Sequence, residues 1–188
     1  MMHKLWLKKP KLNYSNKIVD IAQFGSSIFE NNTFNDIDIA IIFKKIPIKE
    51  QLNESQKIKR QLEKVIKIPI HIKSFDLYSF FDAGNFAKED ILFYGKSLIF
   101  GDDFAKRFGF KPKLQISYNL YDLPKKGKVK FHYMLKGKKE EYGLLRKYNG
   151  KLLKPGLIEI LPECKVIFIL SIKKITTNFI IRKVFEIY

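Results

Sequence analysis

Residues 24–43 read FGSSIFENNTFNDIDIAIIF, and this stretch decides how the first half of the chain folds. An apolar run over residues 18–24 ends in Gly25, which can adopt the backbone conformation of a tight turn. A second apolar run begins after Asp36 and reaches Phe43. Its residues are apolar on both faces of an extended chain, which is typical of a central strand. The pattern predicts two neighbouring strands joined by a turn and a short turn or helix over residues 27–35.

Two aspartates stand at the head of the second strand. Residues two apart in a strand share a face, so Asp36 and Asp38 project the same way, with Cα atoms roughly 6.5 Å apart. Ile37 and Ile39 then point into the core. Paired carboxylates opposite a glycine turn suit a divalent metal ion and a phosphate.

The rest of the first half alternates helices and strands. Apolar residues at helical spacing predict a helix over residues 50–67, with Ile58, Leu62, Val65 and Ile66 in one stripe. Alternation predicts a third strand over residues 68–75. Short helices are expected from residue 77 and over residues 87–94, the latter closed by Gly95, before a short strand or turn over residues 97–100.

The order apolar run, Gly25-Ser26, spacer, Asp36, apolar, Asp38, apolar resembles the signature of the DNA polymerase β-like nucleotidyltransferases. The resemblance is to the small, minimal members and covers residues 14–103. It implies an α+β fold whose core is a mixed sheet with flanking helices. The segment DILFYGKSLIFG, residues 90–101, also resembles the end of this domain in many members of the family.

This resemblance implies a role for each residue of the motif. Asp36 and Asp38 would be the catalytic metal ligands, and Gly25 and Ser26 would hold the phosphates of a nucleoside triphosphate, with help from Ser27. The metal would be Mg²⁺ or Mn²⁺. Two such ions stabilise the entering and leaving oxygens together during transfer of a nucleoside monophosphate.

The sequence departs from the family pattern on the third strand. The third carboxylate of the family falls where this chain has His71, a poor ligand for Mg²⁺ but a good one for Mn²⁺, zinc or iron. Three interpretations are open: His71 replaces the carboxylate as a metal ligand, Asp76 reaches back, or the site binds nucleotide without turnover. A half-exposed histidine with no role is the plain alternative. Lys73 shares the face of His71 and could offset phosphate charge.

The spacing of apolar runs and turn residues changes near residue 110. This change predicts a first domain over residues 1–110 and a second over residues 111–188. Short apolar runs separated by turn signals predict a smaller second domain that is β-rich or α+β. The expected strands cover residues 116–121, 129–135, 157–161, 166–172 and 178–188. Phe131 and Tyr133 would then share one face of a strand.

The chain is strongly basic, with 36 Lys and Arg against 19 Asp and Glu and a formal net charge of +17. Residues 111–188 hold 18 basic and 6 acidic residues, so this part contributes +12. Such an excess favours a polyanionic partner, and tyrosines interleaved with lysines suit RNA or another nucleic acid. Most of the basic residues are lysine, however. A coding preference or a thermophilic surface also produces a lysine-rich composition, without any nucleic-acid partner.

The remaining composition places the protein in the cytoplasm and away from membranes. Cys164 is the only cysteine, so no internal disulfide can form. The longest apolar runs are about eight residues, far short of the ~20 that span a bilayer.

Two functions therefore follow as expectations. The first is a nucleotidyltransferase that moves a nucleoside monophosphate from a nucleoside triphosphate to a hydroxyl of an RNA or a protein. The second is a degenerate relative that binds nucleic acid or a protein partner. Small family members often serve as the antidote of a toxin–antitoxin pair, which makes such a partner the alternative.

Overall fold

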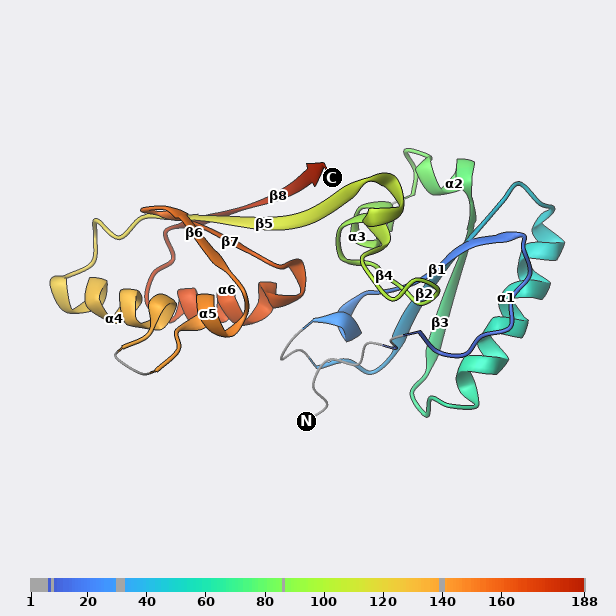
Figure 1. The fold of residues 1–188 in the computed structure, drawn as a ribbon, viewed down its shortest axis with the longest axis horizontal. Helices are drawn as coiled ribbons and strands as arrows, with labels where there is room; N and C mark the ends of the chain where they lie inside the picture. The colour runs from blue at the N-terminus through green and yellow to red at the C-terminus, as the bar shows by residue number, and fades with distance from the viewer. Residues whose placement is uncertain (1–6, 8, 30–32, 86, 139–140, 188) are drawn as a thin grey trace. The chain divides into compact units, whose positions relative to one another are not determined.

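The computed structural model describes residues 7, 9–29, 33–85, 87–138 and 141–187. The chain divides into two compact units. The first ends at Gly109, and the second comprises the chain from Phe110 onward together with Phe29. Each unit has its own four-stranded sheet (Figure 1).

The first unit is built on a four-stranded mixed sheet in the order β3-β2-β1-β4. The strands are β1 (Ile18–Phe24), β2 (Ile37–Phe43), β3 (Ile70–Asp76) and β4 (Lys96–Ser97). Strand β2 runs parallel to β3, whereas β1 is antiparallel to both β2 and β4. The expected strands of this half therefore form, and β2 lies inside the sheet.

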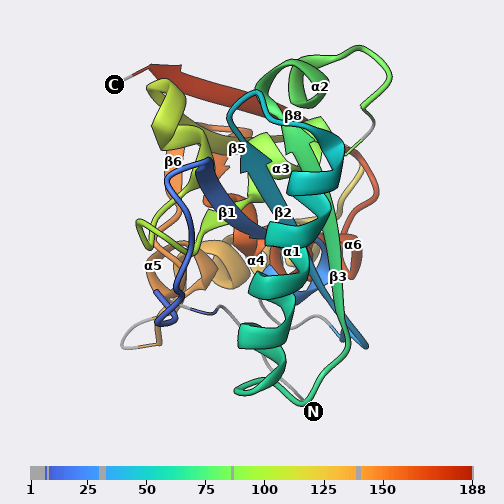
Figure 2. The same cartoon turned by 90° about the vertical axis from the view of Figure 1, so that its right-hand side faces the viewer.

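Both faces of this sheet are covered, which explains why β2 is apolar throughout. One face packs against α1 (Ile48–Glu63) through Ile58 and Leu62. The other packs against α2 (Leu77–Phe81), α3 (Lys88–Tyr94) and the 3-10 helix Phe104–Phe108. Figure 2 shows α1 lying across the sheet.

Two expectations about the first long helix need correction. Helix α1 begins at Ile48 and ends at Glu63, so it stops short of residue 67. Val65 lies beyond its end and is 72% exposed, so it is not part of the buried stripe. In the spacer the structure forms a 3-10 helix, Ser26–Ile28, and residues 30–32 lie outside the described residues.

The second unit has a four-stranded antiparallel sheet in the order β6-β7-β5-β8. Its elements, in chain order, are β5 (Phe110–Tyr118), α4 (Lys125–Lys136), α5 (Leu144–Lys147), β6 (Lys151–Lys154), β7 (Leu157–Ile160), α6 (Lys165–Lys173) and β8 (Phe179–Ile187). This connectivity, with a short extra helix α5, is the split β-α-β arrangement of ferredoxin-like folds. The three helices lie on one side of the sheet (Figure 1).

Two strands expected in this half are helices. Residues 129–135 belong to α4 and residues 166–172 belong to α6, so of the two alternatives, β-rich or α+β, this unit is α+β. A short apolar run without further context does not distinguish a strand from a buried helix. Because residues two apart diverge on a helix, Phe131 is buried whereas Tyr133 is 44% exposed. The expectation that both share one environment is wrong.

No helix among the described residues is both long enough and apolar enough to cross a membrane.

Candidate active site

The carboxylate pair lies where β2 begins. Asp36 directly precedes the strand, and Asp38 is its second residue. In the ladder Asp38 stands opposite Phe24 of β1 on one side and opposite His71 of β3 on the other. Directly paired residues share a face of a sheet, so Asp38 and His71 project on the same side. The fold therefore brings together the two candidate aspartates and the histidine.

Gly25 follows β1 directly and turns the chain next to Asp38. Its φ is +78°, in the left-handed region where a side chain is strained. A Cβ added to Gly25 would lie 3.1 Å from Cγ of Asp38 and closer still to its Oδ2. The backbone of this turn thus sits directly against the carboxylate, an approach that only glycine permits.

The pKa of the Asp38 carboxyl is raised above its ordinary value. Burial is the main cause, and the neighbouring charge of Asp36 adds to it. Lys73 and His71 oppose the shift. A buried carboxylate beside a second carboxylate is an arrangement that a divalent cation would stabilise.

His71 contacts the carboxylate pair rather than standing apart from it. Its Nδ1 lies 3.3 Å from Oδ2 of Asp36, with 62% of the histidine side chain exposed. Lys73 lies two residues further along β3, and its Nζ stands 5.7 Å from the centre of the Phe24 ring. Both side chains are therefore within the electrostatic reach of Asp38.

The two serines of the turn differ in their surroundings. Ser26 is half-buried at the start of the 3-10 helix. Ser27 is fully buried, and its Oγ accepts a hydrogen bond of 2.9 Å from Nε2 of Gln23. Gln23 in turn accepts a hydrogen bond from the backbone N–H of Leu7. Ser27 therefore anchors the turn to β1. Because Ser26 is only half-buried, it is the more accessible of the two to a phosphate.

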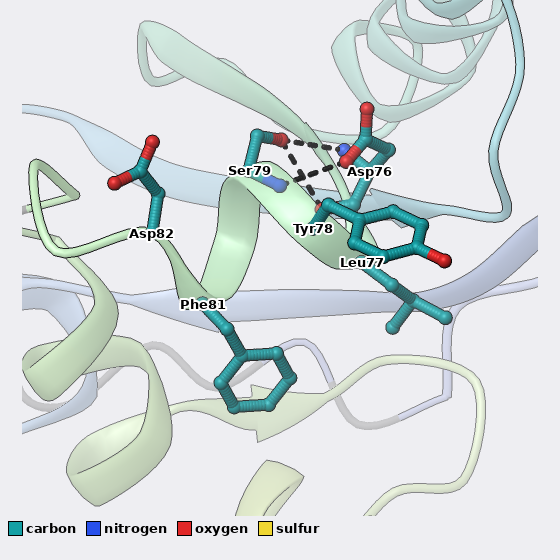
Figure 3. A pocket seen from close by; sticks show the side chains of 6 residues that line it. All are labelled: Asp76, Leu77, Tyr78, Ser79, Phe81 and Asp82. Atoms are coloured by element: carbon teal, nitrogen blue, oxygen red, sulfur yellow. Dashed lines mark hydrogen bonds between the residues drawn. The ribbon is translucent and has the colours of Figure 1, made fainter.

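Asp76 lies at the opposite end of β3. It pairs with Phe43 in the ladder and caps α2, where its Oδ1 accepts a hydrogen bond of 2.8 Å from the Ser79 backbone N–H (Figure 3). It lies five positions beyond His71 along the strand, a distance of ~16 Å. This placement argues against Asp76 as the third metal ligand. A hollow of about 670 Å³ surrounds this end of the strand, lined by Asp76, Leu77, Tyr78, Ser79, Phe81 and Asp82.

The residues present fit a metal ion in part. Asp36 and Asp38 supply the oxygen ligands that Mg²⁺ prefers, and a bound triphosphate would add more. Among the described residues, no three His, Cys, Asp or Glu side chains gather closely enough to hold a metal ion. The two carboxylates would therefore hold the ion together with substrate oxygens. His71, the predicted third ligand, contacts Asp36 but does not form a three-residue metal site with the pair.

A second polar network lies deep in the first unit, where the sequence analysis placed only an apolar strand. Asp20 of β1 is fully buried, and its Oδ1 accepts hydrogen bonds from Oγ of Ser97 and from the Ile21 N–H, each 2.7 Å. Its Oδ2 has no hydrogen-bond partner among the described residues. Burial is the chief reason why its pKa rises to about 6. The sequence signal for this buried network is an aspartate, Asp20, inside the apolar run of residues 18–24.

Comparison of the chain with protein-family models, with curated proteins and with solved structures found no match.

Proposed function

We propose that the protein is a nucleotidyltransferase of the DNA polymerase β-like type. It would transfer a nucleoside monophosphate from a nucleoside triphosphate to a hydroxyl group, with release of pyrophosphate and of the hydroxyl proton. The observation that carries the proposal is the approach of Gly25 to Asp38. A turn whose backbone abuts a metal-binding carboxylate can hold the terminal phosphates close to a metal ion. Such proximity is required for in-line transfer.

Each residue would have a distinct task. The backbone N–H groups of the Gly25-Ser26 turn would donate to phosphate oxygens, and Lys73 would offset part of their charge. Asp36 and Asp38 would hold the metal, and their mutual repulsion is what its binding relieves. When bound, the metal ions supply charge stabilisation to the entering and leaving oxygens.

A specific observation favours a second function for the same site. His71 stands in the ladder directly opposite Asp38, and its Nδ1 contacts Asp36. If this histidine does not support catalysis, the protein binds a nucleotide without transferring it. It would then act as a binding module for nucleic acid or for a protein partner of the toxin–antitoxin type.

Radiolabel transfer separates these functions. The protein would be incubated with each α-³²P-labelled nucleoside triphosphate, Mg²⁺ or Mn²⁺, and either total RNA or total protein as acceptor. Label on an acceptor, absent with Asp36→Asn/Asp38→Asn, supports the transferase. Bound nucleotide that is recovered intact, with no labelled acceptor under either metal, supports the binding module.

A further inference from the structure

The second unit contains a groove between helix α4 and the β6–β7 turn that the site in the first unit does not use. Two adjoining hollows of about 340 Å³ and 590 Å³ form it. Both are lined by the same five residues, Tyr118, Leu120, Lys128, Pro155 and Gly156. The groove is therefore one continuous feature that runs from the side of α4 to the end of the sheet.

The floor of the groove is aromatic and apolar. The Tyr118 ring lies 4.7 Å from the Phe131 ring, centre to centre, at an angle of 47°. Leucines line the smaller hollow. Tyr121 lines the larger hollow and is 84% exposed. An exposed ring beside an apolar floor is suited to the flat face of a nucleobase.

The rim of the groove is cationic. Lys128 and Lys136 come from α4, and Lys154 comes from the end of β6. Helix α4 has five lysines and no acidic residue. Among the described residues no ion pair neutralises any of these five lysines or Lys154. These charges are available to phosphate groups.

The backbone holds the groove in shape. The Tyr118 N–H donates to the Gly156 carbonyl at 2.8 Å, and the Tyr121 N–H donates to Oδ1 of Asn119 at 2.8 Å. Gly156 has φ +83°, and a Cβ there would lie 3.1 Å from the Tyr118 carbonyl oxygen. A groove fixed by hydrogen bonds needs little ordering when a ligand binds.

The sheet of this unit is the less suitable surface. Some four-stranded modules with the same connectivity bind RNA by stacking bases on aromatics of the two central strands. Here the central strands are β5 and β7, and the face away from the helices carries Lys113, Gln115, Ser117, Leu157 and Glu159. None of these is aromatic, and Glu159 would repel phosphate.

We infer that the groove between α4 and the β6–β7 turn binds single-stranded nucleic acid, with bases against the aromatic floor and phosphates along the lysine rim. A duplex hides its base faces and could use only the rim. Lysines on the rim, with no arginine, favour binding that is independent of sequence. That the bound nucleic-acid strand is also the hydroxyl acceptor would rest on the proposed function. The binding of a single strand in the groove does not depend on that function.

Fluorescence anisotropy on the full chain tests the inference without any nucleotide or metal. The probes are fluorescein-labelled 12-nucleotide oligouridine and oligothymidine, and a 12-base-pair duplex. We expect single strands to bind more tightly than the duplex, with an affinity that falls steeply as salt rises. Tyr121→Ala should weaken binding by about fivefold or more, which corresponds to ~1 kcal/mol of stacking.

Charge reversal locates the surface. Lys128→Glu/Lys154→Glu should weaken single-strand binding by about tenfold or more, whereas Lys173→Glu/Lys174→Glu, with the same change in net charge away from the groove, should weaken it less than about threefold. Thermal melts establish that each variant is folded. Equal losses in both double variants, or binding unaffected by Tyr121→Ala, would overturn the inference. So would binding of acidic peptides such as polyglutamate in place of the oligonucleotides.

The two proposals can fail separately. Asp36→Asn/Asp38→Asn should retain the oligonucleotide affinity of the wild type, because the groove lies in the other unit. A groove variant that binds poorly yet still transfers label would leave the first unit's chemistry intact.

Discussion

Gly25 and Asp38 lie so close together that the position of a Cβ on Gly25 is already occupied by the Asp38 carboxylate. Gly25 begins the loop that joins β1 to β2, and Asp38 is the second residue of β2. The antiparallel ladder pairs Asp38 with Phe24, the residue before Gly25. The closeness of turn and carboxylate is thus a consequence of the sheet register. A change at either residue must affect the other.

Gly25→Ala should therefore damage both stability and binding. The left-handed conformation costs alanine roughly 1–2 kcal/mol, and the new methyl group also displaces Asp38. We expect metal-dependent nucleotide affinity to fall by at least about tenfold, which is ~1.4 kcal/mol. Urea unfolding and calorimetry measure the two effects.

Gly109→Ala is the matched control for that variant. Gly109 has φ +75°, but a Cβ there would meet nothing within 4 Å. It should share the conformational cost and retain nucleotide binding. Equal binding by the Gly25 and Gly109 variants would contradict the role of the turn.

The pKa of Asp38 reports on its neighbours. Because the charge of Asp36 raises it, Asp36→Asn should lower the Asp38 pKa; because Lys73 opposes the shift, Lys73→Gln should raise it. Carboxyl ¹³C NMR titration of Asp38 measures both directly. If neither variant moves the Asp38 pKa, the carboxylates and the lysine do not form one electrostatic site.

Asp20 should make the protein less stable as pH rises through the mildly acidic range. Burial raises its pKa from 3.8 to about 6, so the folded state retains a proton that the unfolded chain has released. The contribution of this retained proton to the free energy of unfolding is fully present below pH ~4 and is lost as the pH rises through about 6. The free energy of unfolding changes by up to ~3 kcal/mol over this range.

Asp20→Asn removes this titration. The free energy of unfolding of the variant, minus that of the wild type, should increase between pH 4 and pH 7 in urea titrations. Asp122→Asn, at an exposed position, is the control and should show no such increase. A difference that stays constant with pH would mean that Asp20 keeps its ordinary pKa in the folded state.

His71→Asp should change the metal preference of the site. The substitution places a carboxylate opposite Asp38 in exchange for the imidazole nitrogen that contacts Asp36. We expect the ratio of Mn²⁺ to Mg²⁺ affinity to fall by about tenfold, or ~1.4 kcal/mol, because Mg²⁺ prefers oxygen ligands. His132→Asp, on the exposed side of α4, makes the same chemical change elsewhere and should leave the ratio unchanged.

The first unit could be predicted largely from its sequence because local signals and burial agree there. The apolar run after Asp36 requires cover on both faces, and the structure supplies α1 on one face and α2 with α3 on the other. The face shared by Asp38 and His71 follows from the period of two and the parallel ladder. The pairing of Asp36 with His71 and the anchoring of Ser27 by Gln23 depend on side-chain placement that no spacing reveals.

The second unit was less predictable, for a physical reason. In residues 125–136, lysines surround an apolar pair, Phe131 and Leu135, that is spaced for one face of a helix. The alternation of Val129, Phe131 and Tyr133 resembles a strand equally well. Only the sheet, assembled from residues far apart in the chain, decides between the two.

The most direct test of the central claim is calorimetric titration of ATP into the protein with Mg²⁺ or Mn²⁺, compared with Asp36→Ala/Asp38→Ala. We expect metal-dependent binding to the wild type and its loss in the folded double variant, with a preference for Mn²⁺ if His71 is a ligand. Binding that does not require metal, or that survives in the double variant, would contradict a nucleotide site at Asp36 and Asp38.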